Sequence, residues 1–337
     1  MIYFFNYSLF IIKNYKFIEM YKLRDWVNID KLDGSKLSYN SSIGAIQLLE
    51  KYPNKINWIL MSKNKNAGYL LEQNLNKVHL WSLSENSSDE AIKLLEKYPE
   101  YISWIFLSSN PKATHILERN LDKIKWWYLS SNPNATHILK QNIDKIDWSQ
   151  LSHNSSTDAI EILKQYPENI DWSELSSNQS YEAMRILEQN LDKIDWINLS
   201  CNPMAIHILE KYPENIDWIE LSRNPNAIHI LKKYPENIDW TMLSENPNAC
   251  DLLKKNITHP DICWYALSSN PSAISILEEN IDKIDWDSLS ENPEIFTYDY
   301  EYMKNNFYGK NCYGKELVEK LFHPNNFFKF GTNQWNI

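Results

Sequence analysis

The sequence predicts an all-α protein, an α-solenoid of about eleven helix-turn-helix repeats of 22 or 24 residues with terminal caps. Two observations predict this fold. The segments 194–215 and 216–237 are identical at 18 of 22 positions, and a fixed period in this range is typical of stacked repeats. A Leu (Met at position 61) also recurs from Leu37 to Leu289 at intervals of only 22 or 24 residues, and in ten of twelve units a Trp lies three residues before it.

The first helix of each unit follows an Asn-Pro step. Asn202 is a good N-cap and Pro203 suits the first helical position, while Ala205, Leu209 and Tyr212 recur on one helical face. The next proline, or an Asn-Leu-Asp-Lys segment in other units, ends this helix. In four 24-residue units a serine takes over as the cap, three residues before an alanine. These serines are Ser42, Ser88, Ser156 and Ser180.

The second helix is shorter and carries the Trp. Asp217 is expected to cap it, with Glu220 completing a capping box, and Trp218 and Leu221 form an apolar pair. Helices of this length are not stable alone, so we expect a buried Trp-Leu layer between units. With helix layers ~8–10 Å apart, the array is expected to be a rod or arc on the order of 100 Å long.

The array divides the chain into three parts. Residues 1–40 hold an N-terminal apolar segment and a degenerate capping repeat, in which Gly34 stands where Trp is expected; residues 41–292 form the repeat array, and residues 293–337 form a C-terminal cap with a helix predicted over 315–322. The apolar run 2–12 is shorter than the ~20 residues that span a bilayer, so no membrane association is expected. This run is either a hydrophobic cap or lies upstream of a true start at Met20.

The charge and the cysteine content of the chain argue against nucleic acid as a partner and indicate a reducing environment. The formal net charge is −10 and is spread along the chain, which opposes binding to nucleic acid because phosphate contacts need clustered Lys and Arg. Four cysteines without a C-x-x-C motif indicate free thiols in a reducing compartment.

The repeat IDWxxLSxNPNAIxIL, followed by KYPENIDW or NLDKIDW, resembles a tandem-repeat family of giant double-stranded DNA viruses of amoebae (mimivirus-like). The resemblance covers roughly residues 21–330. It implies a viral protein located in the host cytoplasm or in the virion, but it brings no established activity with it.

Candidate catalytic and metal residues have structural explanations. His115, His137, His207 and His229 share one repeat position and could form a metal ladder, but the same position holds varied polar residues in other units, which indicates a solvent-facing stripe. The recurring Asp residues sit at predicted caps, and the Ser after each Leu has no repeat-independent His and acid. We therefore expect neither enzyme activity nor a metal or cofactor.

Apolar residues follow the Trp position in the N-terminal third of the array. They are Ile59, Leu60, Ile105, Phe106, Trp127 and Tyr128. Later units hold polar residues there, such as Ser149 and Gln150. These side chains either form an exposed stripe for a protein partner or thicken the core near the cap.

The sequence thus favours a non-catalytic scaffold for protein-protein interaction, since solenoids offer extended surfaces whose variable positions bind partners. The alternative is a virion structural component that self-associates through its ends or its stripe. The candidate interaction surface consists of the six apolar residues and the four histidines, and the pattern assigns neither a specific partner nor an oligomeric state.

Overall fold

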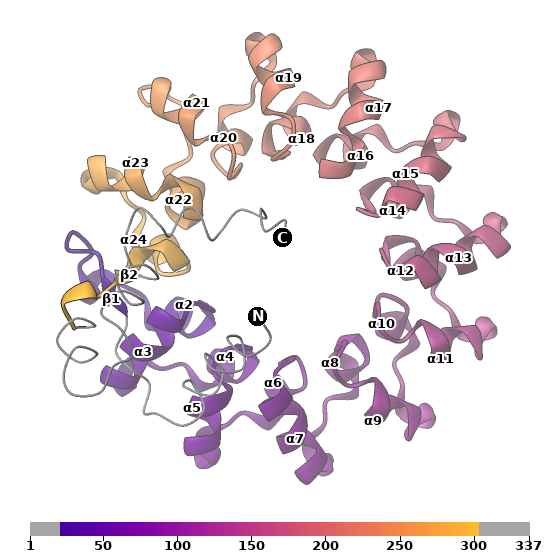
Figure 1. Ribbon diagram of the computed structural model, residues 1–337, viewed down its shortest axis with the longest axis horizontal. Coiled ribbons are helices and arrows are strands. Elements are labelled where there is room, and N and C mark those ends of the chain that lie inside the picture. Colours follow the sequence, from indigo (N-terminus) through magenta and orange to yellow (C-terminus); the bar gives the residue numbers. More distant parts are fainter. Residues whose placement is uncertain (1–20, 303–337) are drawn as a thin grey trace, which may run out of the picture.

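The computed structural model describes residues 21–302, which form a closed ring of short helices (Figure 1). Each unit contributes one helix to an inner layer and one to an outer layer, and the units follow one another around the ring in sequence order. The predicted all-α repeat architecture is confirmed.

The inner layer consists of helices that begin at the recurring Trp or at the residue in its place. They are α2 (Gly34–Tyr39), α4 (Trp58–Lys63), α6 (Leu80–Leu83), α8 (Trp104–Ser109), α10 (Trp126–Ser130), α12 (Trp148–His153), α14 (Trp172–Ser177), α16 (Trp196–Cys201), α18 (Trp218–Arg223), α20 (Trp240–Leu243), α22 (Trp264–Ser269) and α24 (Trp286–Leu289).

The outer layer consists of the helices that follow each Asn-x-x step. They are α3 (Ile43–Lys51), α5 (Gly68–Gln73), α7 (Asp89–Lys97), α9 (Thr114–Glu118), α11 (Thr136–Lys140), α13 (Thr157–Gln165), α15 (Tyr181–Glu188), α17 (Ile206–Lys211), α19 (Ile228–Lys233), α21 (Cys250–Lys255) and α23 (Ile274–Glu279). A 3₁₀ turn before most inner helices completes the unit, as at η8 (Leu191–Lys193) and η10 (Pro213–Asn215).

The extra residues of the serine-capped units lengthen the outer helix rather than a loop. Ser156 Oγ accepts from the backbone N–H of Ala159, as predicted, and α13 runs for nine residues. In the 22-residue units the outer helix begins later. Asn202 caps only the 3₁₀ turn η9 (Pro203–Ala205), and α17 starts at Ile206. The extra pair therefore converts a turn into helix.

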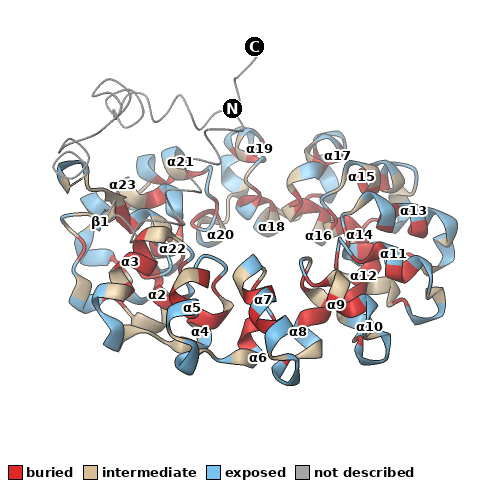
Figure 2. Cartoon of the chain, turned by 60° about the horizontal axis from the view of Figure 1, so that its bottom comes forward, coloured by how far each residue is buried: buried red, intermediate tan, exposed pale blue. Residues whose placement is uncertain are grey.

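The core lies between the two layers and follows the whole ring (Figure 2). The inner Leu, exemplified by Leu221, and the outer Ala and Leu, exemplified by Ala227 and Leu231, are fully buried. The predicted burial of Trp is only partly right, because Trp218 is half-buried. Tyr234 packs against its ring, with the ring centroids 5.3 Å apart.

Units that end in Asn-Leu-Asp-Lys or Asn-Ile-Asp-Lys cover their Trp with the lysine instead. Lys193 Nζ lies 4.6 Å from the centroid of the Trp172 ring, and Lys145 Nζ lies 4.8 Å from that of Trp126. Such contacts between a cation and an aromatic face are favourable. In both kinds of unit, therefore, a side chain from the end of the unit covers one face of the Trp: a Tyr in one kind and a Lys in the other.

A ladder of buried asparagines joins the inner helices. Asn202 Nδ2 donates to the carbonyls of Ser176 (3.0 Å) and Asn178 (2.9 Å) in the preceding unit, and its Oδ1 accepts from the N–H of Met204. The residues of this ladder are Asn40, Asn64, Asn86, Asn110, Asn132, Asn154, Asn178, Asn202, Asn224, Asn246, Asn270 and Asn292. Sequence reasoning found the cap but missed the bonds between units.

A second ladder runs through the serine after each Leu. Ser200 Oγ donates to the carbonyl of Trp196 and accepts from the N–H of Asp217 in the next unit at 3.0 Å. Asp217 caps α18 as predicted, since its Oδ1 accepts from the N–H of Glu220. The predicted capping box does not form, because the N–H that Glu220 would bind is already bonded to Ser200.

The two ends of the array meet and close the ring, so the expectation of an open rod or arc with free ends is wrong. Asn40 Nδ2 donates to the carbonyls of Ser290 (3.1 Å) and Asn292 (3.2 Å), and the N–H of Asp33 donates to Ser290 Oγ (2.9 Å). Both ladders therefore continue across the junction between α2 and α24. We call this junction the seam.

The seam is a unit assembled from both ends of the chain. The C-terminal side supplies α24, while the N-terminal side supplies the 3₁₀ turn η1 (Ile29–Lys31), and Lys31 Nζ lies 4.7 Å from the centroid of the Trp286 ring. This Asn-Ile-Asp-Lys turn precedes α2 in sequence but completes the last unit in space.

Two short strands stand where the twelfth outer helix would lie. Strand β1 (Tyr21–Leu23) pairs antiparallel with β2 (Phe296–Tyr298), with Lys22 opposite Thr297, although the sequence predicted no strand. Gly44 lies beneath this pair, and a Cβ placed there would approach the Phe296 ring to 2.4 Å. Gly34 replaces Trp for a similar reason, because a Cβ would lie 2.2 Å from the carbonyl oxygen of Lys55.

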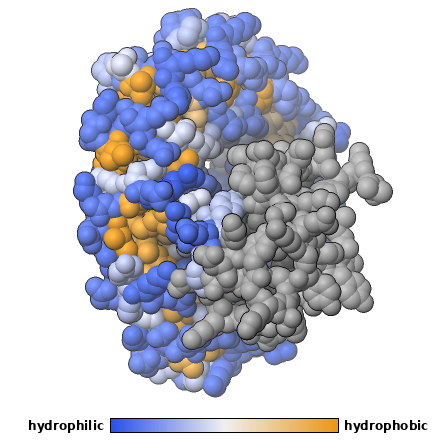
Figure 3. All heavy atoms as spheres, turned by 60° about the vertical axis from the view of Figure 1, so that its left-hand side comes forward, coloured by the Kyte–Doolittle hydropathy of each residue, from blue (hydrophilic) through white to orange (hydrophobic). Residues whose placement is uncertain are grey.

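The predicted terminal segments lie largely outside the described residues. The apolar run 2–12, the helix predicted over 315–322 and most of the C-terminal cap fall there. Of the predicted cap, the described residues hold η14 (Pro293–Ile295) and β2, both at the seam. The outer surface near the seam is mainly hydrophilic, with hydrophobic residues in separate patches (Figure 3).

Candidate functional site

The inner helices expose one face toward the centre of the ring. In α4, Met61 and Ser62 are buried against the core, while Ile59, one residue after the Trp, is 51% exposed. Positions one, two and five residues after the Trp lie opposite the buried Leu and Ser on a helix of 3.6 residues per turn. Because the outer layer covers the buried face (Figure 1), these three positions form the inner wall of the ring.

Four consecutive inner helices, α4 to α10, carry large apolar side chains on this wall. We call them the apolar arc, and they are Ile59, Leu60, Trp81, Ile105, Phe106, Trp127 and Tyr128. Trp81 and Trp127 are 63% and 50% exposed, Ile59, Ile105 and Phe106 are exposed, and Leu60 and Tyr128 are half-buried. The alternative that these residues thicken the core therefore does not describe their positions.

Trp81 was missed in the sequence because it lies one place after the usual Trp position, which Leu80 occupies. The displacement was itself the signal. Leu80 packs partly against the core in the place of Trp, and the indole is transferred to the exposed wall position.

Two contacts hold the aromatic side chains of the arc. The rings of Trp127 and Tyr128 pack edge to face, with centroids 4.7 Å apart, and Lys63 Nζ lies 5.3 Å from the centroid of the Phe106 ring. Lys63 also pairs with Glu85 at 2.8 Å. Aromatic rings held in this way lose little conformational entropy on binding, which suits them to be contact residues.

The rest of the inner wall is more polar and carries an excess of carboxylates. The exposed apolar residues there are Ile197 and Ile219, on the neighbouring helices α16 and α18, and Tyr265 on α22. They form a shorter run than the four helices of the arc. The charged residues of the wall from α14 to the seam are Glu174, Glu220, Arg223, Glu245, Asp287 and Glu291.

Several of these carboxylates form ion pairs along the wall. Arg223 contacts both Glu220 (3.4 Å) and Glu245 (3.5 Å), and Lys36 Nζ lies 3.1 Å from Glu291 across the seam. The hydrogen bond to Glu291 raises the pKa of Lys36. The few basic groups of the wall are thus already paired, so the wall retains net negative charge.

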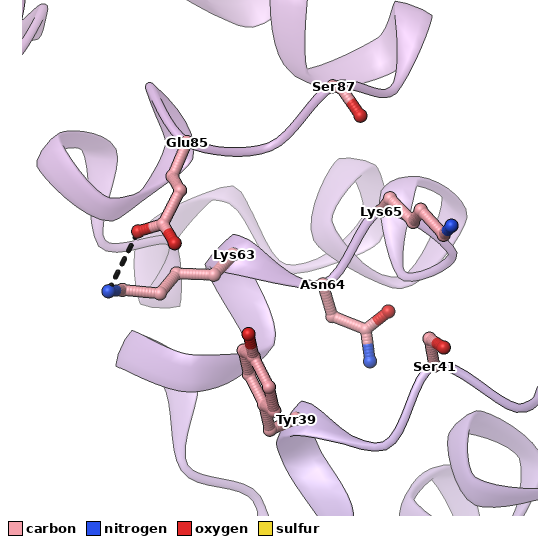
Figure 4. Close-up of a pocket in the computed structure, with 7 residues that line it drawn as sticks. All are labelled: Tyr39, Ser41, Lys63, Asn64, Lys65, Glu85 and Ser87. Atoms are coloured by element: carbon pink, nitrogen blue, oxygen red, sulfur yellow. Dashed lines mark ion pairs between the residues drawn. The ribbon is translucent and has the colours of Figure 1, made fainter. Parts of the chain in front are cut away.

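A polar pocket of about 290 Å³ lies at the C-terminal ends of α2, α4 and α6 (Figure 4). It is lined by Tyr39, Ser41, Lys63, Asn64, Lys65, Glu85 and Ser87. The Lys63–Glu85 pair lies beside it, and Asn64 is engaged in the ladder through its bonds to the Ser38 and Asn40 carbonyls. The pocket therefore offers polar contacts but no nucleophile paired with a base.

The four histidines of the predicted surface lie elsewhere, on the outer helices α9, α11, α17 and α19. His115 is half-buried and the other three are exposed, and each has its Nε2 near the Oε1 of a glutamate in the preceding unit. The pairs are His115–Glu96 (3.0 Å), His137–Glu118 (2.6 Å), His207–Glu188 (3.2 Å) and His229–Glu210 (2.8 Å). The structure thus separates the histidines from the apolar residues with which the sequence analysis grouped them.

The residue types that could carry chemistry have structural roles. The repeated serines are bonded in their ladder, and the repeated aspartates cap helices. Burial raises the pKa of the Cys201 and Cys250 thiols, which disfavours a reactive thiolate. Across residues 21–302, no group of three His, Cys, Asp or Glu side chains is arranged to hold a metal ion.

Comparison with family models, with curated proteins and with solved structures found no match to this chain. Among the helices of the described residues, none has the length and apolar character needed to cross a membrane.

Proposed function

We propose that this protein is a non-catalytic scaffold for protein-protein interaction and that the apolar arc of the inner wall binds the partner. One observation carries the proposal. At the position after the Trp, the four consecutive helices α4 to α10 expose Ile59, Trp81, Ile105 and Trp127. The next two units hold Ser149 and Ser173 at this position, so the repeat does not require apolar residues there.

The physical cost of this exposure supports a binding role. Contiguous exposed apolar surface is disfavoured in water and marks interaction sites. Trp and Tyr are also the residues that contribute most at protein interfaces. A chain that could place Ser at these positions, but carries two indoles there, is best explained by a partner that covers them.

Ring closure weighs against the alternative of self-association through the ends of the array. The first and last described units bond to each other at the seam through Asn40, Asp33 and Ser290. From the resemblance to giant-virus repeat proteins, we propose that the scaffold acts in the host cytoplasm or in the virion.

The test is a comparison of two double variants of the tagged full chain by affinity purification and quantitative mass spectrometry. Trp81→Ala with Trp127→Ala removes the arc, and Ile197→Ala with Ile219→Ala removes the same wall position on α16 and α18. We expect at least one protein to be recovered at least fivefold less with the arc variant and unchanged with the control. Identical recovery with both variants, each with an unchanged melting temperature, would contradict the proposal.

A further inference from the structure

We infer that the apolar arc binds an extended segment of another protein, with an apolar centre of about eight residues and basic residues on both sides. This inference rests on the proposed function and specifies the chemistry of the partner. It is argued from the length of the arc, from the aromatic rings that lack a cation and from the carboxylates on either side.

The length of the arc sets the length of the apolar centre. The arc spans three intervals between adjacent inner helices, from α4 to α10. At ~8–10 Å per interval this is roughly 24–30 Å, and an extended chain advances about 3.3 Å per residue. A segment of about eight residues therefore contacts all four helices.

The aromatic rings of the arc favour cations as well as apolar side chains. The protein places a lysine over the half-buried Trp of several units, and within the arc Lys63 lies over Phe106. Within residues 21–302, however, no Lys or Arg lies over the rings of Trp81 and Trp127, which are the most exposed aromatic side chains of the arc. A basic residue of the partner can occupy such a face.

Carboxylates lie beyond both ends of the arc. After α10 the next carboxylate on the wall is Glu174, which lies 3.3 Å from His153 Nδ1. Before α4 the wall continues through Lys36 of α2 to Glu291, its partner, and to Asp287 at the seam. Lys36 and Lys63 are neutralised by Glu291 and Glu85. The net charge of −10 adds a long-range attraction for a basic segment.

Other occupants fit the arc less well. A membrane surface cannot reach it, because the arc lies on the inside of the ring (Figure 1). Nucleic acid is opposed by the carboxylates of the wall. A second copy would have to insert part of its outer surface, and the side of that surface near the seam is mainly hydrophilic (Figure 3).

The test uses the full chain and two fluorescein-labelled peptides, measured by fluorescence anisotropy at low salt. Both peptides contain the apolar centre LPVFLPVF, one flanked by three lysines on each side and the other by three glutamates. We expect the lysine-flanked peptide to bind at least tenfold more tightly. The Trp81→Ala/Trp127→Ala variant should lose at least tenfold in affinity, whereas Ile197→Ala/Ile219→Ala should change it less than twofold.

A further variant tests the carboxylates, since Glu174→Gln with Asp287→Asn should reduce the preference for lysine flanks at least threefold. Equal binding of the two peptides, or preference for glutamate, would overturn the inference. A lack of binding by both peptides would also overturn the inference. In that case the proposed function would still stand if the arc variant recovers less of a cellular partner in the affinity purification. A change in molecular mass of the arc variant in solution would identify a second copy as the occupant and would also overturn the inference.

Discussion

The seam and a regular junction between units share their inner bonds but differ in their outer packing. Between α14 and α16, Asn202 Nδ2 donates to the carbonyls of Ser176 and Asn178. At the seam, Asn40 makes the same two bonds to the carbonyls of Ser290 and Asn292. The asparagine ladder is therefore the part of a junction that closure preserves.

The outer layer at the seam is built differently. A regular junction packs two outer helices side by side, as α13 does with α15, whereas at the seam α3 packs against the two short strands. Both kinds of junction thus keep the asparagine bonds between neighbouring inner helices, whereas a pair of strands can take the place of an outer helix. This difference also predicts that the same substitution has different consequences at the two places.

The largest effect is expected from removing a ladder asparagine at a regular junction. Asn178→Ala leaves the carbonyls of Ser152 and Asn154 and the N–H of Ser180 without their buried partner. The two carbonyls are buried and the Ser180 N–H is only partly buried. Unsatisfied buried groups cost about 1–3 kcal/mol each, so we expect the free energy of unfolding in urea to fall by roughly 2–6 kcal/mol. The exposed neighbour Gln179→Ala serves as the control. An effect no larger than that of the control would show that the ladder contributes little.

The equivalent substitution at the seam should open the ring without unfolding it. Asn40→Ala removes the same two bonds, but the ends of the chain can separate while the other junctions stay intact. The loss of stability is therefore limited to the free energy of closure, and we expect it to be smaller than that of Asn178→Ala. Small-angle scattering should show a larger radius of gyration for Asn40→Ala than for the native ring, and an unchanged radius would indicate that other seam contacts suffice.

The outcome for the two ladders also shows what the sequence could predict. The caps at Asp217 and Ser156 were predicted because each depends on two residues only three positions apart. The bonds of Asn202 connect residues 24 and 26 positions apart, and closure depends on a small rotation per unit summed around the ring. One feature of the sequence did indicate closure: residues 28–31 have the Asn-Ile-Asp-Lys pattern that ends a unit, but no repeat unit comes before them in the sequence.

For the candidate site, too, the sequence identified the residues but not their arrangement in space. Ile59, Ile105 and Trp127 were identified because the repeat shows which positions vary. Their location inside a ring, and their separation from His115 and the other histidines, required the three-dimensional arrangement.

A smaller effect is expected from a pair of glycine substitutions in outer helices. Alanine is favoured over glycine inside a helix by about 0.5–1 kcal/mol. Gly68→Ala should show at most this gain, because Gly68 is the first residue of α5 and its Cβ would lie 3.0 Å from the Cβ of Glu90, which must shift by a few tenths of an ångström. Gly44→Ala should instead be destabilising, because its Cβ would approach the Phe296 ring to 2.4 Å and displace β2. Thermal unfolding of both variants measures the difference, and equal gains would mean that the β1–β2 pair shifts at no cost.

The smallest effect is a dependence of the seam on alkaline pH. The Tyr298 hydroxyl of β2 and the Tyr21 hydroxyl of β1 form a hydrogen bond of 3.1 Å, and burial raises the pKa of Tyr298 above its ordinary value near 10. A raised pKa in the folded state favours the neutral phenol, so its contribution to closure is complete below pH ~10 and is lost as the pH rises from there through the folded-state pKa. We expect the radius of gyration of the native ring to begin to increase above pH ~10. Tyr298→Phe, which cannot ionise, should show a smaller increase over the same range. If the two proteins open with the same pH profile, ionisation of Tyr298 does not control closure.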